Sequence, residues 1–270
     1  MASRDRTHLV VCLLPLLILP ACVSQPPDSA PGKSPASLPD DARPHEEPRS
    51  RYGNGPLYEV YGESYRVLDS SYGYQERGVA SWYGKKFHGR KTSNQETYDM
   101  HAMTAAHKTL PLPTYVRVRN LKNNRSIVVR VNDRGPFVDN RLIDLSYSAA
   151  LKLDMIQAGT GLVEITAISF DEAPAPSAAV KPVTASPASA GNIAQIYVQV
   201  GAFGDAQNAR RRLTLLRDNG ISKTFVQEDT ARSPTLYRVR IGPIANVTQF
   251  DALVARLKKL GIAESHLVTD

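Results

Sequence analysis

The stretch Tyr197-Val198-Gln199-Val200-Gly201 returns 41 residues later as Arg238-Val239-Arg240-Ile241-Gly242. In both copies apolar residues alternate with other residues, which is the period of a strand with one buried face. C-terminal to each copy, apolar residues recur at the spacing of one face of a helix, and a glycine ends this predicted helix. These positions are Ala209, Leu213, Leu216 and Gly220 in the first half, and Phe250, Val254, Leu257 and Gly261 in the second. With a further strand at 224–227 and at 266–268, the repeat predicts a βαββαβ, ferredoxin-like domain of the α+β class.

The region before this repeat has a different pattern, with many short β-like runs. These runs are 79–83, 116–118, 127–131 and 162–168. In 127–131 apolar and other residues alternate, so we expect a strand with one mostly apolar face. We expect one helical turn at 104–108 and a short helix at 146–153 with Ser146 as its N-cap. Many short strands with little helix predict a mainly β domain in the form of a small barrel.

Two segments poor in large apolar residues divide the chain. Residues 22–51 are dominated by Pro, Ser, Asp and Glu, and residues 171–191 by Pro, Ala and Ser. Neither can bury enough surface to offset the entropy of ordering, so we interpret them as a flexible tether and a linker. The first domain is then 52–170, where a tyrosine-containing lead-in up to residue 78 packs on the barrel. The second domain is 192–270.

The N-terminus has the pattern of an export signal. Basic residues precede an apolar run at 9–19 that is too short to span a bilayer. The run ends in Leu19-Pro20-Ala21-Cys22, which is close to the lipidation site of bacterial lipoproteins. We therefore expect a signal peptide at 1–21 and a lipid on Cys22; an ordinary secretory signal is the alternative. The second cysteine, Cys12, lies inside the signal, so the mature chain has no disulfide.

Composition and charge limit the classes of molecule that this chain is expected to bind. The chain has 270 residues, 42% of them hydrophobic, and a formal net charge of +7. Residues 78–169 hold 13 Lys and Arg against 7 Asp and Glu, and residues 193–270 hold 11 against 7. Basic domains attract polyanions. Because the chain is exported and lacks the aromatic strand motif of RNA-binding modules, we expect an anionic envelope polymer such as peptidoglycan and no nucleic acid. A solvated basic surface without a ligand is the alternative.

Three carboxylates are candidates for chemistry. Glu96 and Asp99 lie in the polar loop 92–99, and Asp133 follows the strand run 127–131. A strand that runs into a polar turn places its last side chain at the rim of a barrel, where reactive groups are common. The alternative is that Asp133 is a turn residue bonded to its own backbone, and that Glu96 and Asp99 are solvated loop residues.

The histidines and basic residues give weaker signals. His88, His101 and His107 lack the spacing that places two ligands on one metal, so we expect no metal site. Lys108, Arg134 and Arg141 could bind an anionic substrate or face water. Cleavage of a glycosidic bond by the sugar's own 6-hydroxyl needs only a carboxylic acid and a helper carboxylate. Asp133 and Glu96 are the candidates, and no cofactor is implied.

Several longer motifs make the first domain resemble the rare lipoprotein A family. They are Ala80-Ser81-Trp82-Tyr83-Gly84, Phe87-His88-Gly89, Thr104-Ala105-Ala106-His107-Lys108-Thr109-Leu110-Pro111, Asn132-Asp133-Arg134-Gly135-Pro136 and Ile143-Asp144-Leu145-Ser146. The C-terminal repeat resembles a SPOR domain through Tyr197-Val198-Gln199-Val200-Gly201-Ala202-Phe203 and Tyr237-Arg238-Val239-Arg240-Ile241-Gly242-Pro243.

This resemblance implies a double-psi β-barrel and the activity of a septal lytic transglycosylase. Such an enzyme cleaves between N-acetylmuramic acid and N-acetylglucosamine, on glycan strands stripped of stem peptides, and leaves a 1,6-anhydro end. The family's acidic and histidine positions match Glu96, Asp99, His107 and Asp133. Asp133 is then the general acid and Glu96 its partner, while Asp99 and His107 shape the site. A lipid anchor on Cys22 followed by Val23 favours the outer membrane, facing the periplasm, with division proteins as possible partners.

The resemblance also implies that the SPOR domain binds stripped strands and brings the protein to the division septum. Gln199, Phe203, Tyr237 and Arg240 are the candidate glycan contacts, with edge packing as the alternative for the two aromatic residues. Because Gln199 alternates with two valines, it should face away from the helices.

One position departs from the family pattern. Gln95 stands before Glu96 where glycine is usual, and a positive φ there would cost about 1 kcal/mol. Two other functions stay open: a glycan-binding scaffold that does not cleave, and a hydrolase that leaves reducing ends.

Overall fold

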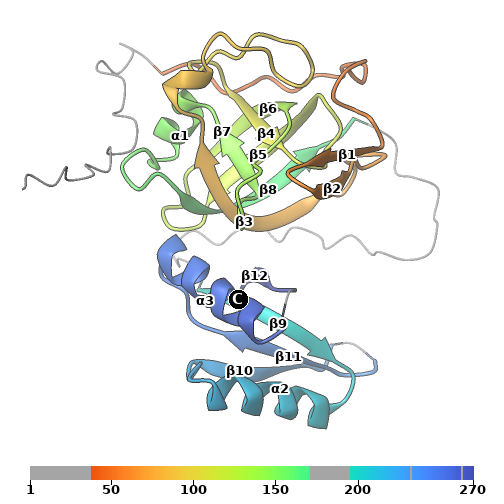
Figure 1. Ribbon diagram of the computed structural model, residues 1–270, viewed down its shortest axis with the longest axis vertical. Coiled ribbons are helices and arrows are strands. Elements are labelled where there is room, and N and C mark those ends of the chain that lie inside the picture. The colour runs from red at the N-terminus through yellow and green to blue at the C-terminus, as the bar shows by residue number, and fades with distance from the viewer. Residues whose placement is uncertain (1–37, 171–194, 232, 263) are drawn as a thin grey trace, which may run out of the picture.

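The computed structural model describes residues 38–170, 195–231, 233–262 and 264–270. The expected signal peptide, the lipidated Cys22 and the linker at 171–191 lie outside these ranges. Two folded bodies are seen, one formed mainly of strands and one of strands and helices (Figure 1). Within the described ranges, no helix combines the length and the apolar character that crossing a membrane requires.

The first body is a closed barrel of six strands. They are β3 (Gln75–Trp82), β4 (Thr104–His107), β5 (Thr114–Asn120), β6 (Ser126–Asp133), β7 (Ile143–Leu145) and β8 (Gly161–Ile168). Around the barrel the order is β3-β7-β4-β6-β5-β8, with parallel pairs at β3-β7 and β4-β6. The expected double-psi β-barrel is confirmed. Its core is built from the apolar side of each strand, as at Val116, Ile127 and Val129, which are at most 2% exposed.

Of the two helical segments expected in this domain, one is present and the other is a strand. Helix α1 (Tyr147–Lys152) is present, and the hydroxyl of Ser146 accepts the N–H of Ala149 as the N-cap predicts. The helical turn expected at 104–108 is wrong, because Thr104–His107 is strand β4. Its alanines favour a helix locally, but β4 pairs with β6 on one side and β7 on the other, and this pairing overrides the local preference. A short 3₁₀ helix, η1 (Lys85–Phe87), follows β3.

The segment before the barrel is more closely attached than its composition suggests. The lead-in forms a hairpin of β1 (Leu57–Val60) and β2 (Glu63–Arg66). Residues 38–51, expected as part of a flexible tether, instead run along the barrel. The N–H of Ala42 donates to the carbonyl of Val128, and the N–H of Ser50 donates to that of Leu112. We call residues 38–51 the strap; polar contacts of this kind hold it in place, and Ala42 also packs against the barrel core.

The second body confirms the βαββαβ prediction. Its elements are β9 (Ile196–Phe203), α2 (Ala206–Asp218), β10 (Thr224–Asp229), β11 (Leu236–Ile241), α3 (Val247–Lys259) and β12 (His266–Thr269). The sheet order is β10-β11-β9-β12, with both helices on one side of it (Figure 1). Gly220 and Gly261 follow the helices with φ of 74° and 71°, as glycine C-caps require. Val198, Val200, Val239 and Ile241 meet the helices in one core.

Candidate active site

A bulge in β6 decides which way Asp133 points. Along β4, Ala105 pairs with Val131. The next residue, Ala106, pairs with Asp133, which leaves Asn132 as an extra residue in the ladder. Without this bulge, Asp133 would share the buried face of Val131, because side chains alternate along a strand. The bulge therefore turns Asp133 out of the core while Val131 stays inside it.

The carboxylate of Asp133 is anchored through one of its oxygens. Oδ1 accepts hydrogen bonds from the N–H of Ser93 at 2.7 Å, the hydroxyl of Ser93 at 2.6 Å and the N–H of Arg134 at 2.8 Å. Oδ2 has one partner among the described residues, the hydroxyl of Tyr83 at 3.4 Å. Asp133 is half-buried. Its carboxylate is thus held in a fixed orientation, and Oδ2 is the less engaged of its two oxygens.

The loop that supplies Ser93 is a tight hairpin. The N–H of Gln95 donates to the carbonyl of Thr92, and the N–H of Thr92 donates to that of Glu96, both at 2.9 Å. Gln95 has φ of 72°, which is the left-handed position that usually follows the turn in such a three-residue loop. The condition under which Gln95 would cost energy in place of glycine is therefore met. A side chain at this φ costs about 1 kcal/mol, so the loop is formed against local strain.

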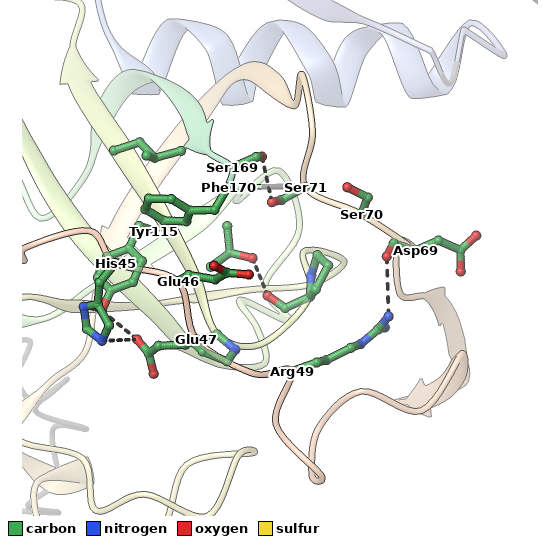
Figure 2. Close-up of a pocket in the computed structure, with 14 residues that line it drawn as sticks. His45, Glu46, Glu47, Arg49, Asp69, Ser70, Ser71, Tyr115, Ser169 and Phe170 are labelled. Carbon is green, nitrogen blue, oxygen red and sulfur yellow. Dashed lines mark hydrogen bonds and ion pairs between the residues drawn. The ribbon is translucent and has the colours of Figure 1, made fainter. Parts of the chain in front are cut away.

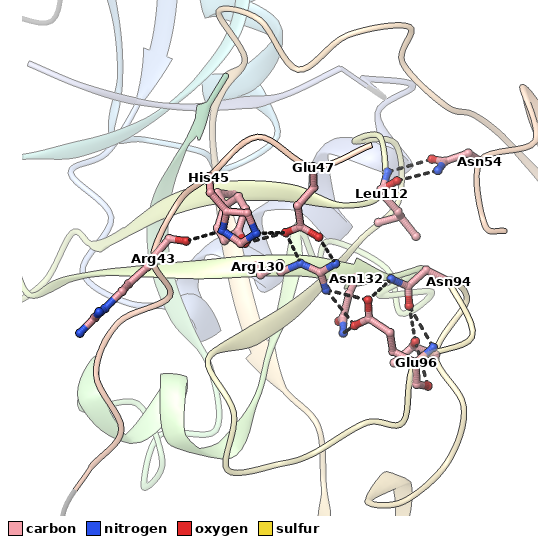
Figure 3. Close-up of polar contacts among 11 residues, drawn as sticks. Arg43, His45, Glu47, Asn54, Asn94, Glu96, Leu112, Arg130 and Asn132 are labelled. Atoms are coloured by element: carbon pink, nitrogen blue, oxygen red, sulfur yellow. Dashed lines mark hydrogen bonds and ion pairs between the residues drawn. The ribbon is translucent and has the colours of Figure 1, made fainter. Parts of the chain in front are cut away.

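Glu96 lies in the same loop, and four hydrogen bonds hold its carboxylate. Nη1 of Arg130 donates to both oxygens, at 2.9 and 2.8 Å, while Nδ2 of Asn132 and Nδ2 of Asn94 each donate at 2.8 Å (Figure 3). Burial raises the pKa of Glu96, but the bonds from Asn132, Arg130 and Asn94 outweigh burial and hold the pKa below its ordinary value. Glu96 is therefore a fixed carboxylate and a poor proton donor.

Arg130 joins the loop to the strap. Nε and Nη2 of Arg130 donate to the two carboxylate oxygens of Glu47, at 2.8 and 2.7 Å (Figure 3). Glu47 also accepts the hydroxyl of Tyr115 at 2.6 Å, within a shallow pocket of about 200 Å³ lined mainly by the strap, Tyr115 and the end of β8 (Figure 2). Neither Glu47 nor Arg130 was a candidate site residue from the sequence. Glu47 was overlooked because it lies in the segment that was expected to be a flexible tether. The one available signal was Arg130 itself, a charged residue inside a strand run that is otherwise apolar.

His107 is buried and holds the backbone after β4. Its Nδ1 accepts the N–H groups of Thr109 and Leu110, and its Nε2 lies 3.0 Å from the hydroxyl of Tyr74. Burial, aided by the charges of Arg134 and Lys108, lowers the pKa of His107 to about 3. The ring is therefore neutral at physiological pH and fixes the backbone of Thr109 and Leu110.

Asp99 has a separate set of contacts. It accepts the N–H of His101 at 2.9 Å and lies 3.7 Å from Nδ1 of His88. In the described part of the chain, no hydrogen bond or ion pair links Asp99 to Asp133 or Glu96.

The basic residues near the site are engaged within the protein. Nη1 of Arg134 donates to the carbonyls of Leu110 and His107. Nζ of Lys108 donates to the carbonyl of Arg141 at 2.6 Å, and the guanidinium of Arg141 makes two 3.0 Å bonds to Asp251. Across the described ranges, no group of three His, Cys, Asp or Glu side chains could hold a metal ion.

The four candidate glycan contacts of the second domain come together as two cross-strand pairs. Arg240 pairs with Gln199, and Tyr237 pairs with Phe203. Gln199 and Phe203 line a pocket of about 540 Å³, to which Arg212 and His266 also contribute. Gln199 Oε1 is buried and has no hydrogen-bond partner within the described residues. Phe203 and Tyr237 pack against the core, which agrees with the edge-packing alternative for the aromatic residues.

Comparison with known proteins places both domains. The model of a family described as lytic transglycolase matches residues 75–165, and that of the SPOR domain matches residues 194–268. A Vibrio cholerae protein named endolytic peptidoglycan transglycosylase RlpA is 40% identical, over 97% of this chain and 97% of the relative. A Pseudomonas aeruginosa protein of the same name is 32% identical, over 99% of each chain.

Among solved structures, the SPOR domain of Pseudomonas aeruginosa RlpA matches 27% of this chain and 96% of its own, at 25% identity and a TM-score of 0.26. The full-length relatives, with the two domain matches in the same order, establish that this chain belongs to the RlpA family.

Proposed function

We propose that the protein is an endolytic lytic transglycosylase of peptidoglycan. It cleaves the bond between N-acetylmuramic acid and N-acetylglucosamine in glycan strands stripped of stem peptides, and it leaves 1,6-anhydro ends. Membership of the RlpA family supports this activity, because the full-length relatives carry the name of that reaction. In the reaction the 6-hydroxyl oxygen of the muramyl residue attacks its own C1 as the C1–O4 bond breaks, so no water is consumed.

The observation that carries the proposal is the placement of Asp133. Its Oδ1 is fixed by three hydrogen bonds and its Oδ2 is left with one long contact. A carboxyl group held in this way can exchange a proton with a bound glycan without reorganising. Glu96, kept charged by Arg130 and Asn132, is placed in the same loop, where its charge offsets the positive charge that develops on the sugar ring. Asp99 and His107 shape the site.

The second domain is proposed to bind the same stripped strands and to bring the enzyme to the division septum. The match to the SPOR domain supports this role. Gln199, with its unpartnered buried oxygen, and Arg240 are the contacts that we expect to meet sugar hydroxyls and amides. Phe203 and Tyr237 would contribute apolar surface at the edge. A lipid on Cys22 is proposed to anchor the protein at the periplasmic face of the outer membrane, within reach of division proteins.

One observation favours a second function, a septal scaffold that binds glycan without cutting it. Both oxygens of Glu96 are taken by Arg130, Asn132 and Asn94, and the preceding Gln95 is strained. A protein with no second proton-transferring group could bind a glycan strand and leave it intact.

The test is mass analysis of products after residues 24–270 are incubated with amidase-stripped glycan strands. We expect anhydro-ended fragments from the wild type and none from Asp133→Asn, while both proteins retain the strands in a pull-down. Asp154→Asn, in an exposed carboxylate of the same domain, is the matched control and should leave the products unchanged. Reducing ends would indicate a hydrolase. Retention of the strands without any product would indicate the second function, a scaffold that binds glycan without cleaving it.

A further inference from the structure

A row of four residues crosses the barrel beside Asp133. Ala106 of β4 pairs with Asp133 on one side and with Asp144 of β7 on the other. Asp144 in turn pairs with Ser81 of β3. Residues paired in register point to the same face of a sheet, so the two carboxyl side chains share a face, with only the methyl group of Ala106 between them.

The spacing in this row fits a pair of cooperating carboxyl groups. Two strand separations place the Cα atoms of Asp133 and Asp144 about 10 Å apart. The carboxyl groups of glycosidases lie roughly 5 to 9.5 Å apart, on either side of the bond that is cleaved. Asp133, Asp144 and Ser81 are each half-buried, so part of each side chain is exposed to solvent. Ala106, the smallest member, is fully buried and forms its floor.

The surroundings of the two aspartates differ. Oδ1 of Asp133 accepts three hydrogen bonds, whereas Asp144 accepts one from the described residues, donated by the hydroxyl of Ser81. Burial raises the pKa of Asp144, the nearby Asp133 adds to that rise, and Ser81, Lys108 and Arg141 act against it without cancelling it.

Other groups face the same space. Tyr83 and Tyr98 both lie within the field of Asp144, and burial raises the pKa of each, so both hydroxyls stay neutral. Burial also lowers the pKa of Lys108, whose Nζ is bonded to the carbonyl of Arg141. The pKa of Glu96 is lowered by its hydrogen bonds, whereas burial raises the pKa of Asp144.

We propose that Asp144 is a catalytic residue that delivers a proton to the glycosidic oxygen, while Asp133 accepts the proton of the sugar's 6-hydroxyl. This inference rests on the proposed function and divides its two proton transfers between two aspartates. As the C1–O4 bond breaks, its electron pair goes to O4, which takes the proton of Asp144. As the C1–O6 bond forms, the proton of O6 passes to Asp133. One proton then moves from Asp133 to Asp144 through solvent, and the enzyme returns to its starting state.

Two substrates separate a proton donor from a structural residue. On stripped glycan strands, Asp144→Asn should lower kcat/KM at least about 100-fold, because the leaving oxygen needs a proton. On the 4-nitrophenyl glycoside of a peptide-free N-acetylglucosaminyl-N-acetylmuramic acid, the leaving group needs none, and Asp144→Asn should stay within about threefold of the wild type. Asp133→Asn should lose activity on both substrates. Equal losses for Asp144→Asn on both substrates, or no loss on strands, would overturn the inference.

Controls keep the outcomes apart. Asp154→Asn should match the wild type on both substrates. If Asp144→Asn does not fold, Ser81→Ala serves instead: loss of its hydrogen bond should move the alkaline limb of kcat/KM to higher pH, and an unmoved limb would count against Asp144. If the wild type makes no anhydro product, the proposed function fails and the inference fails with it. If the wild type makes anhydro product but Asp144→Asn loses activity equally on both substrates, the inference alone fails.

Discussion

His107 gives a sharp test of the site's architecture, through its effect on stability against pH. The pKa of the buried ring is lowered to about 3 from an ordinary value of 6.5. Between about pH 6.5 and pH 3 the unfolded chain therefore binds a proton at His107 and the folded protein does not. The free energy of unfolding consequently falls as the pH falls through this range. At about 1.36 kcal/mol per pH unit, the folded state should lose about 2 kcal/mol between pH 7.5 and pH 5.0 from this residue alone.

The perturbation is His107→Gln, whose amide can still accept a backbone N–H and donate toward Tyr74 but does not titrate. The chain has a single tryptophan, Trp82, which packs on the barrel core, so its fluorescence in urea titrations reports the unfolding of that domain. The variant is expected to be less stable at neutral pH, yet to show about 2 kcal/mol less acid dependence over this range. Carboxylates that titrate lower are common to both proteins and cancel in the difference. Parallel pH profiles for the two proteins would refute the assigned burial and neutrality of His107.

Four further predictions concern the same domain. Gln95→Gly should raise the free energy of unfolding by about 1 kcal/mol, since it removes the strain at positive φ, and should leave transglycosylation unchanged. Its reverse is Gly89→Ala, at φ of 82° with open space around the new methyl group, which should lower the free energy of unfolding by about 1 kcal/mol; a gain there in thermal melts would contradict the strain argument. Arg130→Met leaves two carboxylates without their shared cation, so we expect a loss of about 2 kcal/mol in urea titrations and a drop in product yield, with full activity counting against the network. Ser146→Ala removes the N-cap of α1 and should cost about 1 kcal/mol in the same titration, whereas an unchanged midpoint would mean that the cap is dispensable.

Much of the fold follows from local pattern. The repeat around Gln199 and Arg240 predicts the second domain, because alternation and helical spacing each specify which side of an element is buried. The cap at Ser146 could also be predicted, since it depends on a single turn of backbone. The turn expected at 104–108 was wrong because strand pairing on both sides of β4 outweighs the helix preference of its alanines.

The candidate site divides in the same way. Family motifs name Asp133, Glu96 and His107, but they do not show what these side chains contact. Glu47 reaches Arg130 from 83 positions away in sequence, a contact that composition hides because the strap is held by polar bonds.

The sequence by itself therefore determined the order of domains, the repeat and the class of residue at the rim of the barrel. Tertiary structure alone decided that Asn132 is a bulge, that Asp133 faces outward, and that Asp144 lies in register with it across Ala106. The physical reason is that the alternation of apolar and polar residues along one strand depends only on the sequence of that strand. Register between strands depends on hydrogen bonds to partners distant in the chain, and one extra residue in the ladder reverses the face on which a carboxylate stands.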